Sequence, residues 1–106
     1  MAYTVTWVLT RPNEETELPT ISGISSANKS ESDTLMADNG VSKTYEIDGL
    51  VTRVIYTFAD KAAHDALDFS GTTDHSTVRS NYKQTLIDRG ITCVITDSDG
   101  VEIANY

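Results

Sequence analysis

The chain has 106 residues, of which 39% are hydrophobic and 23% are charged, and this balance is typical of one soluble globular domain. The formal net charge of −8 argues against nucleic acid as a partner, because affinity for phosphate depends on Lys and Arg. No apolar stretch reaches the ~20 residues that span a bilayer. With a single cysteine, Cys93, and no pattern of a signal peptide, we expect a cytoplasmic protein with no membrane partner.

The segment 3–11 predicts the first strand. Aromatic and β-branched residues alternate there with threonines, as in a half-buried strand, and Pro12 ends it. The face expected to be buried carries Tyr3, Val5, Trp7 and Leu9.

Residues 13–40 are rich in Ser, Thr, Asn and Gly and contain few apolar anchors. We predict a surface loop and then one short, degenerate helix. Ser30 would be its N-cap, Asp33 would complete a capping box, and Asn39–Gly40 would end it.

Residues 41–58 predict a β-hairpin. Asp48–Gly49 between two β-rich runs favours a two-residue turn with positive φ at both positions. Such a turn places Ile47 opposite Leu50 and makes the second strand, ending at Phe58, central in the sheet.

A broken helix follows the hairpin. Asp60 is expected to cap a first piece over "KAAHDAL", and "DFSGTT" interrupts the helical pattern. A second piece then runs to Arg89, capped by Asp74 or Ser76, and Gly90 ends it. The remaining residues predict a buried strand "ITCVIT", a turn "DSDG" and a last strand "VEIANY".

This order predicts an α+β fold over residues 1–106 as a single domain. The expected topology is ferredoxin-like β-α-β-β-α-β with an antiparallel sheet and an extra C-terminal strand. Helices would cover one sheet face, and the other would carry apolar side chains, either Val8, Val51 and Ile55 or the opposite set. Because a monomer rarely leaves such a face open to water, we expect a homodimer or a higher homo-oligomer formed through it.

The stretch "GLVTRVIYTFADKAAHDAL", residues 49–67, resembles the dimeric α/β-barrel superfamily, which includes antibiotic-biosynthesis-type monooxygenases. In those proteins too, a hairpin strand runs into an acid-capped, alanine-rich helix. The resemblance covers residues 3–11 and 41–96, whereas the relatives have a well-formed first helix where this chain has residues 13–40. It implies a dimeric barrel and cofactor-free oxygenation of an aromatic substrate in a cavity between sheet and helices. The opening "YTVTWVLTRP" also resembles small proteins of marine phages.

The two histidines are the first candidates for a site. His64 lies at the edge of the apolar stripe of its helix, so it either faces solvent or reaches such a cavity. Asp74, His75 and Ser76 are consecutive and point in different directions, which argues against a catalytic triad among them. His75 is nevertheless expected near the rim of a cavity, beside the helix break.

Aromatic residues of the sheet are the second candidates. Trp7, Tyr45 and Tyr56 either pack in the core or line a pocket for a small apolar or aromatic ligand. No cofactor is predicted, because "SGTT" lacks the pattern of a phosphate loop and no metal-ligand spacing is present. Three functions stay open: a structural or ligand-binding homo-oligomer, a cofactor-independent monooxygenase or isomerase, and a phage-type interaction protein.

Overall fold

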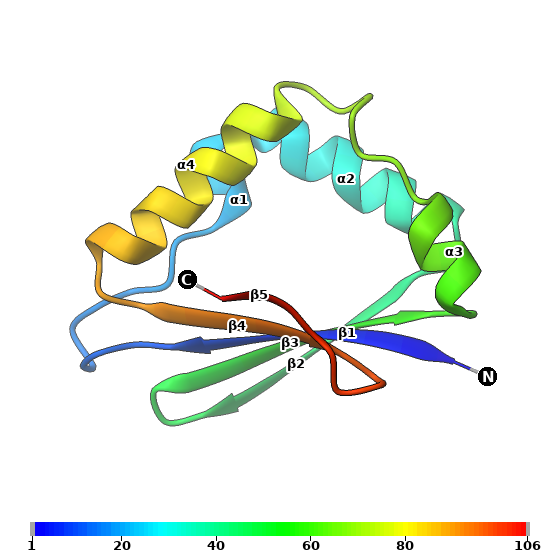
Figure 1. Ribbon diagram of the computed structural model, residues 1–106. Coiled ribbons are helices and arrows are strands. Elements are labelled where there is room, and N and C mark those ends of the chain that lie inside the picture. The colour runs from blue at the N-terminus through cyan, green and yellow to red at the C-terminus, as the bar shows by residue number, and fades with distance from the viewer. Residues whose placement is uncertain (1, 106) are drawn as a thin grey trace.

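The computed structural model describes residues 2–105 as one antiparallel sheet with helices on one face (Figure 1). The elements are β1 (Tyr3–Thr10), α1 (Ile21–Ile24), α2 (Ser26–Asp38), β2 (Ser42–Asp48), β3 (Val51–Phe58), α3 (Lys61–Ala66), α4 (His75–Asp88), β4 (Thr92–Asp97) and β5 (Glu102–Asn105). The strand order is β2-β3-β1-β4-β5. This α+β arrangement is compatible with the predicted ferredoxin-like fold, and β5 is the extra strand beside β4.

The centre of the sheet is β1, which pairs antiparallel with both β3 and β4. Trp7 lies opposite Val54 on one side and opposite Ile95 on the other. Since side chains alternate along a strand, these residues share the face that the helices cover. The buried hydrophobic core lies there and comprises Tyr3, Val5, Leu9, Val54, Phe58, Val78, Tyr82, Leu86, Ile91, Cys93 and Ile95.

The helix layer is anchored by α4. Its buried residues Val78, Tyr82 and Leu86 follow one another at a spacing of four, which places them on one side of the helix. Gly90 then adopts a positive φ of 71° and ends the helical segment as predicted. The chain enters β4 with Ile91, whose side chain is 2% exposed.

The prediction for residues 13–40 was partly wrong. The helix α2 has 13 residues and begins after Ser25, whose side chain accepts a hydrogen bond from the backbone of Asn28. Ser30 lies inside this helix. The predicted start of the helix was wrong because the buried residues of α2, Asn28 and Ser32, are polar. No apolar stripe therefore marks the first turns of this helix in the sequence. The C-terminal end at Asn39–Gly40 is confirmed.

The hairpin is confirmed, but its turn lies one residue further along than predicted. Asp48 pairs with Val51 and Ile47 with Thr52, so Gly49 and Leu50 form the turn. Gly49 has a φ of 57°, whereas Leu50 does not have a positive φ; a turn with glycine first needs only one such position. The change moves each partner by two residues and therefore leaves the predicted faces unchanged.

The break in the second helical region is also confirmed. Asp60 caps α3 through a 2.8 Å hydrogen bond from the backbone N–H of Ala63. The segment 67–74 separates α3 from α4. Asp74 occupies the N-cap position of α4 but its side chain caps nothing, because the residue has a left-handed φ of 49°. The role predicted for Asp74 as a side-chain cap was therefore wrong.

The outer face of the sheet carries no helix within residues 2–105 (Figure 1). Threonines alternate there with four half-buried apolar side chains, those of Val8, Val51, Ile55 and Val94. None of the helices in the described chain is both long and apolar enough to cross a membrane.

Candidate ligand-binding site

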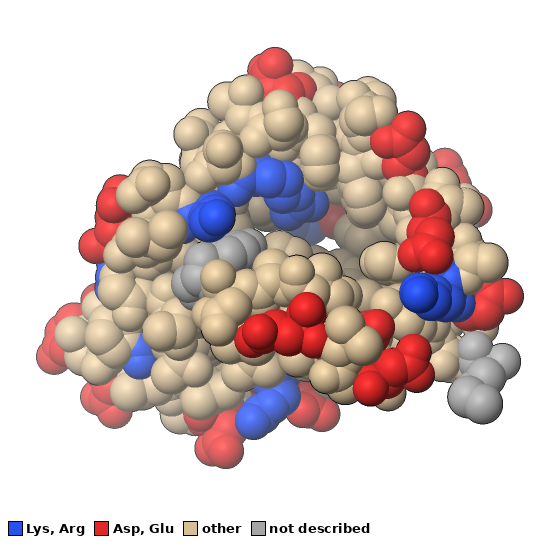
Figure 2. Space-filling model, in the orientation of Figure 1, with Lys and Arg blue, Asp and Glu red and all other residues tan. Residues whose placement is uncertain are grey.

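A cavity of about 530 Å³ lies between the helix-facing side of the sheet and the helices. Figure 2 shows it as a hollow with basic side chains at its upper rim and acidic ones below it. Every helix and strand except α1 and β2 contributes to the lining, as does the break between α3 and α4. The lining residues are Val5, Trp7, Met36, Tyr56, Phe58, His64, Asp65, Leu67, Phe69, His75, Arg79, Ile95 and Ile103.

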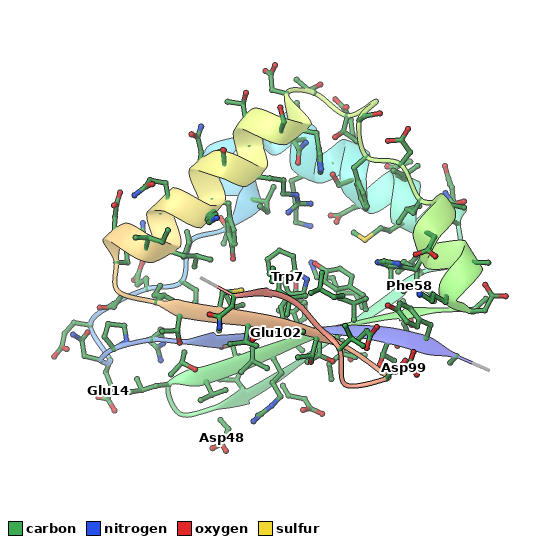
Figure 3. All side chains as sticks on the ribbon, viewed as in Figure 1. Trp7, Glu14, Asp48, Phe58, Asp99 and Glu102 are labelled. Atoms are coloured by element: carbon green, nitrogen blue, oxygen red, sulfur yellow. The ribbon has the colours of Figure 1, made fainter. Side chains whose placement is uncertain are left out.

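A second cavity of about 250 Å³ adjoins the first, and the two share Trp7, Tyr56 and Arg79. Figure 3 shows Trp7 and Phe58 projecting from the sheet toward the helices. The Trp7 ring meets the Tyr82 ring edge-on at 6.5 Å between centroids. Aromatic walls of this kind favour a flat apolar ligand.

His75 begins α4 and lines the main cavity. Its ring stacks on Phe69 with centroids 5.4 Å apart and an interplanar angle of 14°. Its Nδ1 atom is buried and has no hydrogen-bond partner among the described residues. Burial lowers the pKa of His75 below its usual 6.5, and the positive charge of Arg79 lowers it further, against the opposing effect of Asp68. The ring is therefore held neutral at pH 7.

The segment before His75 is fixed by hydrogen bonds from α2. Asn28, which is 0% exposed, donates through its amide to the Thr72 hydroxyl at 3.0 Å and to the Thr73 carbonyl at 3.1 Å. The carboxylate of Glu31 accepts from the Thr73 backbone N–H at 2.8 Å. These hydrogen bonds hold the segment that leads into His75 at the cavity.

His64 also lines the cavity. Its ring lies 5.1 Å from the Tyr3 ring and 5.0 Å from the Phe58 ring, between centroids. Its Nδ1 is 3.0 Å from the Asp65 carboxylate. Of the two placements predicted for His64, the structure has the one at the cavity, although about a third of its side chain stays exposed.

The sheet aromatics fall into two groups. Trp7 and Tyr56 line both cavities, whereas Tyr45 lines only the smaller one and is 60% exposed. Lys43 lies over the rings of Tyr45 and Tyr56, 5.1 and 5.4 Å from their centroids. The structure thus brings four of the five predicted residues to the main cavity and places Tyr45 beside it.

Sequence reasoning missed Arg79, Phe69 and Met36. Arg79 follows His75 by four residues, so the two share one side of α4, and this spacing was the available signal. Met36 and Phe69 offered none, because whether they line a cavity depends on how α2 and the break between α3 and α4 sit over the sheet.

Comparisons of the chain with models of protein families, with curated proteins and with solved structures found no match. Within residues 2–105 no group of three His, Cys, Asp or Glu side chains is placed to hold a metal ion. The functional argument therefore depends on the geometry of the cavity.

Proposed function

We propose that this protein binds a small aromatic or apolar molecule in the main cavity. The observation that carries the proposal is a space of about 530 Å³ whose walls are mostly apolar and which a few polar groups enter. Ligand pockets commonly have this size and this composition. A domain of this length would otherwise fill such a space with side chains, because protein interiors are close-packed.

Trp7 is the single tryptophan of the chain and lines the cavity, so its fluorescence reports occupancy directly. We expect the neutral aromatic probe N-phenyl-1-naphthylamine to quench Trp7 in a saturable titration. Val5→Phe, which adds bulk on the cavity side of β1, should weaken binding by about tenfold or more. The matched control Val8→Phe places the same side chain on the opposite face of β1 and should bind normally. Absence of saturable quenching in the unmodified protein would contradict the proposal.

For the assembly, we infer a homodimer, or a higher homo-oligomer, of the dimeric α/β-barrel type. The support is the outer sheet face, where Val8, Val51, Ile55 and Val94 are half-buried without a covering helix in the described chain. Val51→Glu or Ile55→Glu should give monomers or insoluble protein by light scattering, because a buried charge without a partner is costly. An unchanged dimer would exclude this interface.

A second candidate function is a cofactor-independent enzyme of the monooxygenase or isomerase type. The observation that favours it is the buried Nδ1 of His75, which has no partner among the described residues and belongs to a ring held neutral. A neutral imidazole that lines the cavity is a suitable general base toward an acidic C–H of a bound substrate.

The probe for this chemistry is 2-tetralone, an aromatic ketone with acidic C–H bonds beside its carbonyl. In D₂O the protein should accelerate the exchange of these protons, His75→Gln should abolish the acceleration, and His64→Gln should retain it. Equal exchange rates with and without protein would exclude the enzymatic alternative.

The predicted cytoplasmic location and the absence of a nucleic-acid partner remain inferences from the net charge and the single cysteine. The phage-type interaction protein also stays a prediction. Residues 13–40 form α1 and α2 in the isolated chain, so the structure does not supply the partner-dependent ordering that would favour that function.

A further inference from the structure

Arg79 carries a positive charge at the junction of the two cavities. It projects from α4 one turn after His75 and lines both spaces. Within residues 2–105 it makes no hydrogen bond and no ion pair, since the ion pairs there are Lys29–Asp33 and His64–Asp65. Its side chain is half-buried, and Trp7 and Tyr56 line the same two cavities.

This placement is unusual for so acidic a chain. Sixteen carboxylate side chains are present, yet among residues 2–105 Asp65 is the one that lines the main cavity, and it already contacts His64. Three of the eight basic residues, Lys29, Lys43 and Arg79, line one or both cavities. A half-buried charge that has no counter-charge among the described residues costs stability, and an anionic ligand would offset that cost.

The aromatic surroundings define the rest of the ligand. The Trp7 and Tyr56 rings, and the stacked pair of Phe69 and His75, line the same cavity as Arg79 and provide flat walls for a ligand. Because His75 is held neutral, Arg79 is the residue that carries the positive charge of this wall. A guanidinium binds carboxylates and similar oxyanions through two parallel N–H donors.

We propose that the ligand is an aromatic acid, with its rings in the main cavity and its single anionic group bound to Arg79. The inference rests on the proposed function and specifies it, since it assigns the charge of the ligand and the residue that recognises this charge. The ligand supplies the counter-charge that none of residues 2–105 provides to Arg79 through an ion pair.

Two probes with one skeleton test the role of charge. N-phenyl-1-naphthylamine is neutral, and 8-anilino-1-naphthalenesulfonate adds one anionic group to the same rings. Titrations followed by Trp7 quenching should show the anion binding about tenfold or more tightly than the neutral probe, as expected for one charge-assisted contact. Arg79→Gln should remove this preference and leave the neutral probe within about twofold of its original affinity.

The matched control is Arg53→Gln, which removes a positive charge from the opposite face of the sheet and should preserve the preference. Arg79→Lys keeps the positive charge and should retain part of the preference for the anion. This variant is measured in place of Arg79→Gln if the glutamine variant unfolds in a circular-dichroism melt. Equal affinity of the two probes, or an anion preference that survives Arg79→Gln, would overturn the inference while leaving ligand binding intact. Binding of neither probe would overturn both the inference and the proposed function.

Discussion

The space between the sheet and the helices has two halves that differ in packing. Where β1 ends and β4 begins, Leu9, Leu86, Ile91 and Cys93 are between 0% and 3% exposed and fill the interior. Toward the start of β1 and the end of β3, Val5, Trp7 and Phe58 instead border the cavity. Both halves use the same strands, so the sheet does not cause the difference.

The helix layer causes this difference in packing between the two halves. Over the packed half, α4 extends for 14 residues and inserts Val78, Tyr82 and Leu86. Over the other half, α3 has six residues and is followed by the non-helical segment 67–74 (Figure 1). A short helix and an irregular connection cover less of the sheet than a long helix does. The comparison teaches that the break which interrupts the helical pattern in the sequence is also what leaves room for a ligand.

The largest expected effect comes from the packed half. Leu86→Ala should reduce the free energy of unfolding by about 3 kcal/mol, because Leu86 is fully buried and its removal leaves an empty space. Leu67→Ala, in the wall of the existing cavity, should cost about 1 kcal/mol, since it removes fewer contacts. Urea denaturation of both variants measures the difference. Equal losses would contradict the distinction between the two halves.

The second effect concerns the hydrogen bonds that join α2 to the segment 67–74. Asn28→Ala should cost about 2 kcal/mol, because it leaves the buried Thr72 hydroxyl without its amide donor. It should also loosen the segment before His75, and the His75 ring signals in the NMR spectrum should shift. The control is Asn81→Ala on the exposed side of α4, which should change stability by less than about 0.5 kcal/mol. Unaltered His75 signals in the Asn28 variant would show that α2 does not position this residue.

The smallest effect is a change in the titration of His75. Its pKa should lie below 6.5, the usual value, and Arg79→Gln should raise it, because Arg79 is the second cause of the shift. The folded pKa is lower than the unfolded one. The contribution of His75 to the free energy of unfolding is therefore fully present above its unfolded pKa. This contribution is lost as pH falls through its folded pKa.

An NMR titration of the two histidines, assigned with His64→Gln, measures this directly. A His75 pKa above 6.5 in the unmodified protein would contradict a ring held neutral by the cavity.

The sheet could be predicted from the sequence because alternation marks each strand. That pattern indicates which side of each strand is buried, including the buried side of β1. The turn residues indicate the helix break. The start of α2 could not be predicted, because its buried side is made by the polar residues Asn28 and Ser32. Asn28 is satisfied by a hydrogen bond to Thr72, which lies 44 residues further along the chain.

The site was predictable only in part. Histidines near a helix break and aromatic residues on a sheet are general candidates for a binding site in any protein. On this ground the sequence indicated His64, His75, Trp7 and Tyr56. The cavity itself is a property of how the helices lie on the sheet. Arg79 becomes significant only when the structure shows that none of the acidic residues at positions 2–105 pairs with it.

The most direct test of the account is to map where a ligand binds. Backbone and indole N–H signals would be followed by NMR during a titration with 8-anilino-1-naphthalenesulfonate. The account predicts that the largest shifts fall on the Trp7 indole and on residues such as Phe69, His75 and Arg79, with Arg53 and Ile55 unchanged. Shifts concentrated on the outer sheet face, with the Trp7 indole unaffected, would contradict it.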